Sequence, residues 1–175
     1  MKRKVLVMMT AVMLVVSSYA EVSVTEIPAG TVTIAVDGEA GQIGTETIQG
    51  GNTTYDYASG ISPEAQALIK NAGTLVITGN INSTDIKALV RNNLNDNKWT
   101  LDALDMGGAT IRSIEVKADG PWSITSHDFL PQSYVKIDCM SLTLPVAGDG
   151  ILPNYFGLCL TNKLTSVTLP IDTPK

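Results

Sequence analysis

The chain has few of the side chains that carry out catalysis or hold metal ions. Among its 175 residues are one histidine, two cysteines and only 5% aromatic residues. A catalytic triad needs a histidine placed between a nucleophile and a carboxylate. Structural zinc needs about four Cys, His or acidic ligands in paired spacing. We therefore expect a protein without a metal ion or cofactor that is not an enzyme, and we assign no catalytic residue.

The single histidine, His127, is close in the sequence to Ser123, Ser126 and Asp128. Closeness in the sequence does not build the geometry of a catalytic relay, and the G-x-S-x-G motif of hydrolases is missing. A polar loop histidine is the favoured interpretation.

One pair of acidic residues, Asp102 and Asp105, has the side chains that glycoside hydrolysis requires. Without an aromatic platform for a sugar, these are more simply explained as solvated surface acids. A secreted hydrolase therefore remains the weakest of the functional alternatives.

Two polar patterns come close to ligand-binding motifs. Asn93, Asn95 and Asn97 alternate as calcium ligands do, but Lys98 and Leu104 stand where a calcium loop has Gly and Glu. This pattern favours a solvated loop between a helix and a strand.

The glycines Gly38, Gly41 and Gly44 are spaced G-x-x-G-x-x-G, which differs from the dinucleotide motif G-x-G-x-x-G. Glu39 would also place a negative charge where a phosphate should lie. We interpret them as glycines of a flexible turn.

Positive charge is also scarce, apart from the first residues. Without Lys2, Arg3 and Lys4, 9 of the 12 basic residues remain against 17 acidic ones, a formal charge of −8. Such a chain repels phosphate backbones and anionic lipid heads, so nucleic acid is excluded as a partner.

The beginning of the chain has the layout of a secretory signal peptide. A basic start is followed by an apolar run from Val5 to Val16, and Ser18 and Ala20 are the small residues before a cut. This run is too short to span a bilayer, which takes about 20 residues. We expect residues 1–20 to be removed and the protein to be secreted or at the cell surface, with no membrane span after cleavage.

The two cysteines, Cys139 and Cys159, leave two interpretations open. Outside the cell they could form a disulfide that stabilises the fold by about 3 kcal/mol. They could also be buried thiols that act as small apolar side chains.

The pattern along the chain predicts both strands and helices. Residues 21–36 alternate as two strands around the turn at Pro28–Gly30, and residues 37–60 indicate a long loop with room for one short strand or helical turn. Ser62 caps one helix, the segment Asn82–Asp85 opens a second, and an apolar strand at residues 74–79 lies between them. Residues 99–106 form a further strand, and residues 121–130 are irregular.

The last third contains an internal repeat. Ser141-Leu142-Thr143-Leu144-Pro145 returns as Ser166-Val167-Thr168-Leu169-Pro170, and Leu104-Asp105-Met106 is an earlier, divergent copy. Repeats of 20 to 29 residues are typical of leucine-rich solenoids, in which each unit adds one strand to a shared sheet.

Three segments resemble BspA-like leucine-rich repeat proteins, which are secreted or surface proteins of anaerobic bacteria. Residues 73–87 resemble their entry segment, residues 101–111 their first strand and residues 151–170 their repeat. The resemblance covers about Val32 to Pro170. It implies a curved sheet that binds a partner in adhesion or host contact, and it supplies no catalytic residues. The family usually has many repeats, whereas this chain has about two.

The resemblance also implies which residues form the core of the repeat: Phe156, Cys159, Leu164, Val167 and Leu169. Thr143, Lys163 and Thr168 are expected to face outward.

We therefore expect an α+β fold: an N-terminal strand and loop region at 21–60, then a leucine-rich-repeat-like domain at 61–175, in which a strand and helix cap precedes a short solenoid of stacked strands. The expected function is a non-enzymatic binding or adhesion module whose partner is a protein or glycan on a host or neighbouring cell. A structural capping domain of a larger surface protein is the alternative.

Overall fold

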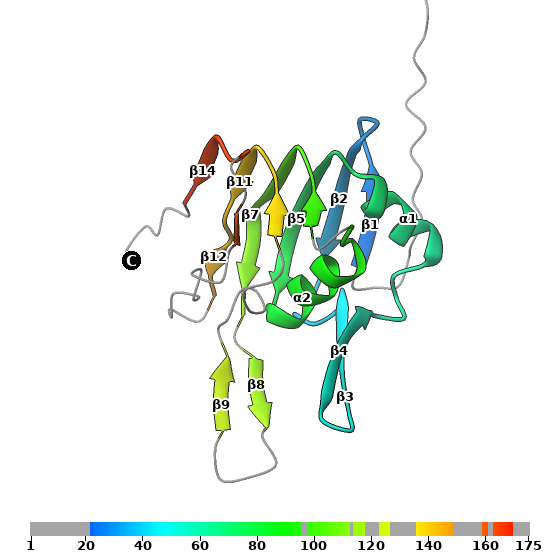
Figure 1. Cartoon of the computed structure of the whole chain (residues 1–175), viewed down its shortest axis with the longest axis vertical. Coiled ribbons are helices and arrows are strands. Elements are labelled where there is room, and N and C mark those ends of the chain that lie inside the picture. Colours follow the sequence, from blue (N-terminus) through cyan, green and yellow to red (C-terminus); the bar gives the residue numbers. More distant parts are fainter. Residues whose placement is uncertain are drawn as a thin grey trace, which may run out of the picture.

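The computed structural model describes residues 22–95, 98–112, 114–117, 123–126, 136–148, 159–160 and 163–169. The expected signal peptide and His127 lie outside the described residues. The described part is a mixed α+β structure in which a large strand-rich sheet, two helices and three small sheets are arranged together (Figure 1). The expected α+β class is confirmed at this level.

The large sheet forms the main body of the molecule. Its strands follow in this order: β1 (Val22–Glu26), β2 (Thr31–Val36), β5 (Thr74–Ile81), β7 (Ala103–Ile111), β11 (Ser141–Thr143) and β14 (Ser166–Thr168). A short strand, β12 (Val146–Ala147), also pairs with β7. Only β1 and β2 are antiparallel, joined by the predicted turn, and all later pairs are parallel.

The two copies of the predicted repeat are neighbours in this sheet. Leu142 lies opposite Val167 in one parallel pair and opposite Leu104 in the next. The repeat and its divergent third copy therefore occupy equivalent positions on adjacent strands, as the sequence predicted.

The same hydrogen-bonded arrangement, which we call the corner, precedes the parallel strands of the main sheet. A single carbonyl oxygen accepts the N–H groups of two successive residues on the next strand. These acceptors are Gly30 for Gly73 and Thr74, Gly73 for Asp102 and Ala103, Asp102 for Met140 and Ser141, and Met140 for Thr165 and Ser166. Five strands therefore begin at equivalent positions, although only three were recognised in the sequence.

Side chains alternate across the sheet, as the period of a strand requires. At the second position of each strand, one face buries Val32, Leu75, Leu104 and Leu142, which are 0 to 2% exposed. The fourth position adds Ile34, Ile77, Met106 and Leu144. This apolar face is the core of the molecule.

Two of the five expected repeat-core residues are not buried. Val167 and Leu169 are 46% and 65% exposed, so this prediction was wrong for them. Val167 stands at a core position of β14 and Leu169 directly follows the strand, but β14 is the last strand of the main sheet and no other described strand covers its outer side. Leu164 packs against the core, as expected. Phe156 lies outside the described residues, and of Cys159 only the backbone is described.

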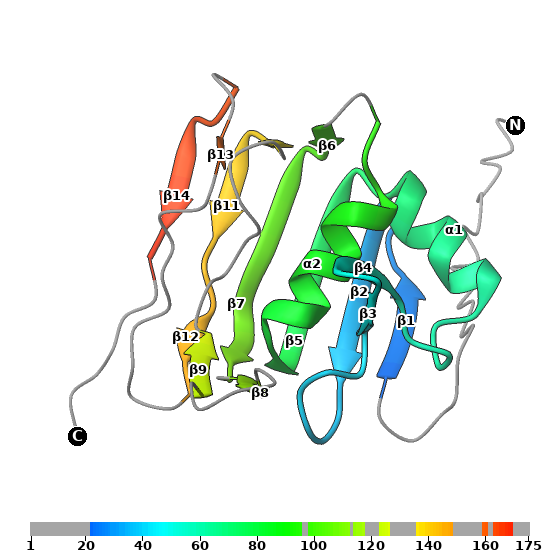
Figure 2. The ribbon, with the colours of Figure 1, turned by 60° about the horizontal axis from the view of Figure 1, so that its bottom comes forward.

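Both predicted helices are present and lie on the same side of the sheet (Figures 1 and 2). Helix α1 (Pro63–Asn71) begins after Ser62, whose Oγ accepts the N–H of Ala65. Helix α2 (Ser83–Asn92) begins after Asn82, which forms a reciprocal capping box with Asp85. These caps are local signals, which is why the sequence placed both helix starts correctly.

Three small sheets complete the structure. The strands β6 (Lys98–Thr100), β10 (Lys136–Asp138) and β13 (Cys159–Leu160) pair in parallel, and two hairpins are formed by β3 (Gly44–Gln49) with β4 (Asn52–Tyr57) and by β8 (Ile114–Lys117) with β9 (Ser123–Ser126). The loop predicted over residues 37–60 is thus mostly a hairpin, and β9 interrupts the segment expected to be irregular. The single strand expected over residues 99–106 is two strands, because the chain turns at Leu101 and Asp102.

Residues 21–60 and 61–175 both contribute strands to the main sheet, because β2 pairs with β5. Among the described residues, no helix is both long enough and apolar enough to cross a membrane.

Candidate binding face

The sheet face opposite the core is a polar surface rich in hydroxyl groups. Its residues occupy the alternate positions of the strands and are half-buried or exposed. The hydroxyl-bearing members are Ser23, Thr25, Thr31, Thr33, Thr74, Thr78, Thr110, Ser141, Thr143, Ser166 and Thr168. We call this surface the polar face. No described helix covers it, since α1 and α2 both lie on the other side (Figure 2).

A β-bulge interrupts the middle of the polar face. Val76 lies opposite Asp105 and Thr78 opposite Gly108, so β7 has one more residue than β5 between these pairs. Bulges of this kind bend a strand and often redirect a side chain beside a functional site. Here the bulge brings two exposed glycines, Gly107 and Gly108, to the centre of the face.

The threonines on either side of these glycines leave no room for a larger residue. A Cβ atom at Gly107 would lie 2.9 Å from Cγ2 of Thr143, and one at Gly108 would lie 2.8 Å from Cγ2 of Thr78. The glycines therefore keep a strip of bare backbone open between two threonine side chains. A ligand can approach a backbone closely at such a strip.

Asp105 is the one charged side chain that the described strands place on the polar face. Its Oδ1 accepts the N–H of Gly107 at 2.9 Å, so the carboxylate is fixed beside the bare backbone. At the end of β7, Arg112 donates from Nε to Oδ1 of Asn80 at 3.1 Å. The face thus offers hydroxyls, a carboxylate and a guanidinium, which are suited to hydrogen bonding with a polar partner.

The two acids considered for glycoside hydrolysis have different positions. Asp105 lies within β7 on the polar face, whereas Asp102 is exposed at the corner before the strand. The carbonyl of Asp102 accepts the N–H groups of Met140 and Ser141, so this residue is part of the repeated corner. The structure thus gives Asp102 a backbone role at the corner.

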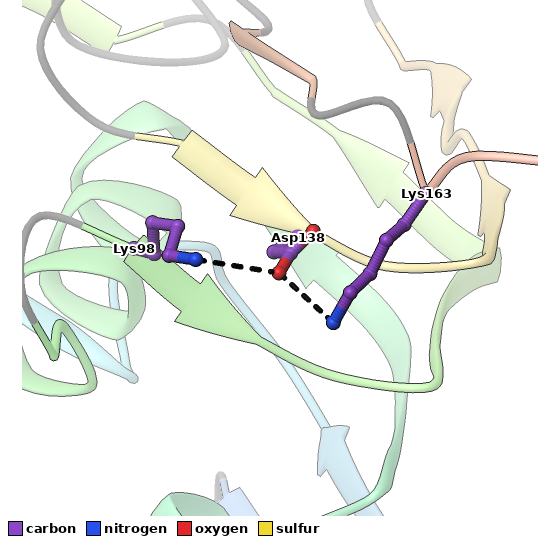
Figure 3. A network of polar contacts seen from close by, with 3 residues as sticks. All are labelled: Lys98, Asp138 and Lys163. Atoms are coloured by element: carbon purple, nitrogen blue, oxygen red, sulfur yellow. Dashed lines mark ion pairs between the residues drawn. The ribbon is translucent and has the colours of Figure 1, made fainter.

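A buried carboxylate connects the small parallel sheet with the chain that follows it. The side chain of Asp138, in β10, is 4% exposed and lies 3.1 Å from Nζ of Lys163 and 3.8 Å from Nζ of Lys98 (Figure 3). Lys98 belongs to β6 and Lys163 lies shortly before β14, so the three charges come from three separate segments of the chain. Lys163 is about half exposed, and it faces outward as expected while also holding this ion pair.

The glycine-rich segment has a defined structural role that its spacing did not reveal. Asp85 is fully buried at the start of α2, and its carboxylate accepts the N–H groups of Gly41, Ile43 and Gly44 at 2.8 to 3.0 Å. The N–H of Asn82 adds a fourth bond. Burial raises the pKa of Asp85, and these hydrogen bonds act in the opposite direction. The interpretation as a flexible turn was therefore wrong for Gly41 and Gly44.

The expected solvated loop at Asn93 is also corrected by the structure. Asn93 is buried, and its Nδ2 donates to the hydroxyl of Tyr57 at 2.6 Å and to the carbonyl of Leu89 at 2.7 Å. Asn95 forms a backbone bridge with Lys98, and Asn97 lies outside the described residues. Asn93 therefore joins the end of α2 to the hairpin β3–β4.

The remaining candidate residues do not form a reactive centre in the described part. Cys139 is a buried thiol in no disulfide, and burial raises its pKa. Ser123 and Ser126 belong to β9, while His127 and Asp128 lie outside the described residues. Across the described ranges, no three His, Cys, Asp or Glu residues gather to hold a metal ion.

The sequence did contain a signal for the polar face. Ser or Thr alternates with an apolar residue at the start of β2, β11 and β14, and a shorter version occurs in β5. The repeat is recognisable in the sequence only in its last copies, because the strands are separated by unequal lengths of chain.

No family model, curated protein or solved structure matches this chain.

Proposed function

We propose that this chain is an exported, non-enzymatic binding module of the leucine-rich repeat type, which contacts a protein or glycan through its polar face. The observation that carries the proposal is the polar face itself: hydroxyl groups on successive parallel strands surround Asp105 and the bare backbone of Gly107 and Gly108. Hydroxyls and a carboxylate bind through many hydrogen bonds, which suits a polar partner.

The solenoid interpretation is supported by the repeated corner and the stacked strands. Each parallel strand starts with the same pair of hydrogen bonds to the strand before it, and the small sheet β6–β10–β13 repeats alongside. In a solenoid, each unit contacts only its neighbours and the apolar face is buried by stacking. We accordingly interpret the chain as a short array of stacked coils with a strand and helix cap.

A binding assay on separate arrays tests the proposal. The purified chain is applied to a glycan array and to a panel of immobilised cell-surface proteins. We expect retention on one of them, and we expect Asp105→Asn to weaken it by about tenfold, because the amide lacks the charge and donates where the carboxylate accepts. Thr143→Val, which removes one hydroxyl, should weaken it less.

The matched control is Asp56→Asn, an exposed acid on the hairpin β3–β4. This variant should bind as the wild type does. If the chain binds to neither array, or if Asp105→Asn and Asp56→Asn behave alike, the polar face is not the binding surface. A purely structural module would be the better explanation in that case.

Export is tested separately. We expect cell fractionation to find the chain in the medium or at the cell surface, and N-terminal sequencing to begin at Glu21. A cytoplasmic chain that keeps Met1 would contradict the proposed export.

A further inference from the structure

The two edge strands of the main sheet differ in how far their apolar side chains are exposed. At the first edge, Val22 and Val24 of β1 are 5% and 0% exposed, and α1 packs near this strand. At the other edge, Val167 and Leu169 are 46% and 65% exposed. The edge at β14 is therefore the one that presents apolar surface.

The backbone of β14 also has hydrogen-bonding groups directed to this edge. Ser166 donates its N–H to Met140 at 3.1 Å, and the carbonyl of Thr168 accepts the N–H of Leu144 at 3.0 Å. Neighbouring residues of an extended strand direct these groups to opposite sides. The N–H and C=O groups of Val167 therefore point away from β11, and continued alternation directs those of Leu169 the same way.

Charge does not protect this edge. Sheet edges are commonly blocked by lysine, proline or a bulge that prevents pairing with another chain. Residues 164–169 contain no charged side chain, and the preceding Lys163 is held in the ion pair with Asp138. A second β14 strand can thus approach without repulsion between charged side chains of the two strands themselves.

We propose that two copies of this chain associate through antiparallel pairing of their β14 strands about a two-fold axis. In the matching register, Val167 of each copy lies opposite Leu169 of the other, and the two Thr168 residues face each other. This register keeps both apolar residues on the core side and the threonines on the polar side. It also pairs the backbone groups directed to the edge, and the two sheets become continuous.

The occupant is a second copy because β14 itself has the required pattern. An antiparallel partner needs two apolar residues separated by one residue, with an outward-facing polar residue between them, and Val167, Thr168 and Leu169 have this order. The polar faces of the two copies would then lie side by side, so the pair would present two binding faces. The proposal does not depend on what the polar face binds.

Sedimentation velocity on the purified full chain across a range of concentrations tests the association. We expect a reversible dimer, and we expect Leu169→Lys to raise its dissociation constant by at least about tenfold, because it places a charge at the centre of the interface. The matched control is Ile48→Lys on β3, since Ile48 is 69% exposed and β3 belongs to a separate two-stranded sheet. It should leave the dimer unchanged.

A crosslinking variant tests the register without relying on Leu169. The opposed Thr168 residues would form a non-hydrogen-bonded antiparallel pair, whose Cα separation of about 4.5 Å suits a disulfide. Thr168→Cys should therefore yield a covalent dimer on mild oxidation, whereas wild type and the exposed hairpin variant Thr53→Cys should not.

A chain that is monomeric at all concentrations would overturn the proposal. So would a dimer that survives Leu169→Lys and does not crosslink through Thr168→Cys, because the interface would then lie elsewhere. A monomer that instead binds a synthetic strand peptide with this pattern would show that the edge accepts a different partner, which also overturns association with a second copy.

Discussion

At the scale of single residues, Asp85 joins the start of α2 to the segment at Gly41–Gly44. It caps α2 and also binds the N–H groups of the loop before β3, through four hydrogen bonds in total. Gly44 has to remain a glycine here, because a Cβ atom would lie 2.5 Å from Cβ of Ala88. The loop before β3 and the start of α2 therefore fit closely together.

Replacing Asp85 with Asn should loosen the loop from the helix. The amide has one acceptor oxygen instead of two, and its NH₂ group would face backbone N–H groups that need an acceptor. Unsatisfied buried donors cost about 1–3 kcal/mol each, so we expect a loss of about 2–4 kcal/mol in the free energy of unfolding. Urea denaturation measures this loss, with Asp56→Asn as the exposed control. Equal midpoints for the two variants would contradict it.

Ionisation of the Tyr57 phenol should make the free energy of unfolding depend on pH in the alkaline range. Burial raises the pKa of Tyr57 from 10.0 to about 12, although the hydrogen bond from Asn93 lowers it. The native state thus keeps a proton that the unfolded chain loses near pH 10. The free energy of unfolding should consequently fall as the pH rises from about 10 to 12, by at most about 1.4 kcal/mol per pH unit.

Tyr57→Phe should remove this decline. Absorbance titration of the wild type should show a phenol that ionises near pH 12, and this component should be missing in Tyr57→Phe. Tyr55→Phe, on the same hairpin strand, should retain it. If the phenol that is lost in Tyr57→Phe ionises near pH 10, Tyr57 is accessible to solvent and the expectation is wrong.

At the scale of elements, the ion cluster around Asp138 connects β10 with β6 and with the segment before β14. The carboxylate is almost fully buried while both lysines are about half exposed, so water screens the cations more than the anion. Losing one lysine leaves the other in place. Losing both leaves a buried carboxylate without either cation, which is a larger penalty.

We therefore expect Lys98→Gln and Lys163→Gln to cost less than about 1 kcal/mol each, and Lys163→Gln to cost more because its contact is shorter. The double variant should cost more than the two single costs combined. Urea denaturation in low salt and in about 1 M NaCl measures these values, and salt should reduce them. Lys70→Gln, at the exposed end of α1, is the control. Additive costs would contradict coupling through Asp138.

Elements with local signals could be predicted from the sequence. Alternating Val and Ile residues gave β1 and β2, and the caps at Ser62 and Asn82 gave both helix starts. The hairpin β3–β4 was missed because it has almost no apolar alternation, and its Ile48 is 69% exposed. Gly50 and Gly51, both with positive φ, are the turn signal that could have revealed it.

Features formed by distant residues could not be predicted in the same way. Nothing near Asp85 in the sequence indicates that its carboxylate binds Gly41 and Gly44, more than 40 positions earlier. Of the residues on the polar face, only Thr143 and Thr168 were expected to face outward. The bulge at Gly107 could not be predicted, because it exists only once β5 and β7 are paired. Burial of Val167 was wrongly predicted, since a core position is buried only when a neighbour covers it.

At the scale of the whole molecule, the strands on the main path of the large sheet follow one another in the same order as in the sequence. Within this path from β1 to β14, each strand is hydrogen-bonded only to the strands next to it in this order. In the solenoid that we propose, stability is approximately the sum of contributions from each unit and from each contact between neighbours. A defect near one end should therefore open that end, whereas a defect in the middle should affect both sides.

Leu142→Ala and Leu75→Ala test this arrangement as a matched pair. Both leucines are fully buried at the same position of their strands, so each cavity should cost about 2–5 kcal/mol. In hydrogen exchange, Leu142→Ala should reduce protection in β11 and β14 and leave β2 nearly unchanged. Leu75→Ala should reduce protection in β2, β5 and β7, because β5 lies between the hairpin β1–β2 and the later strands. Equal loss of protection across all strands in both variants would mean that the sheet opens as one cooperative unit, and local opening at β14 could not then occur.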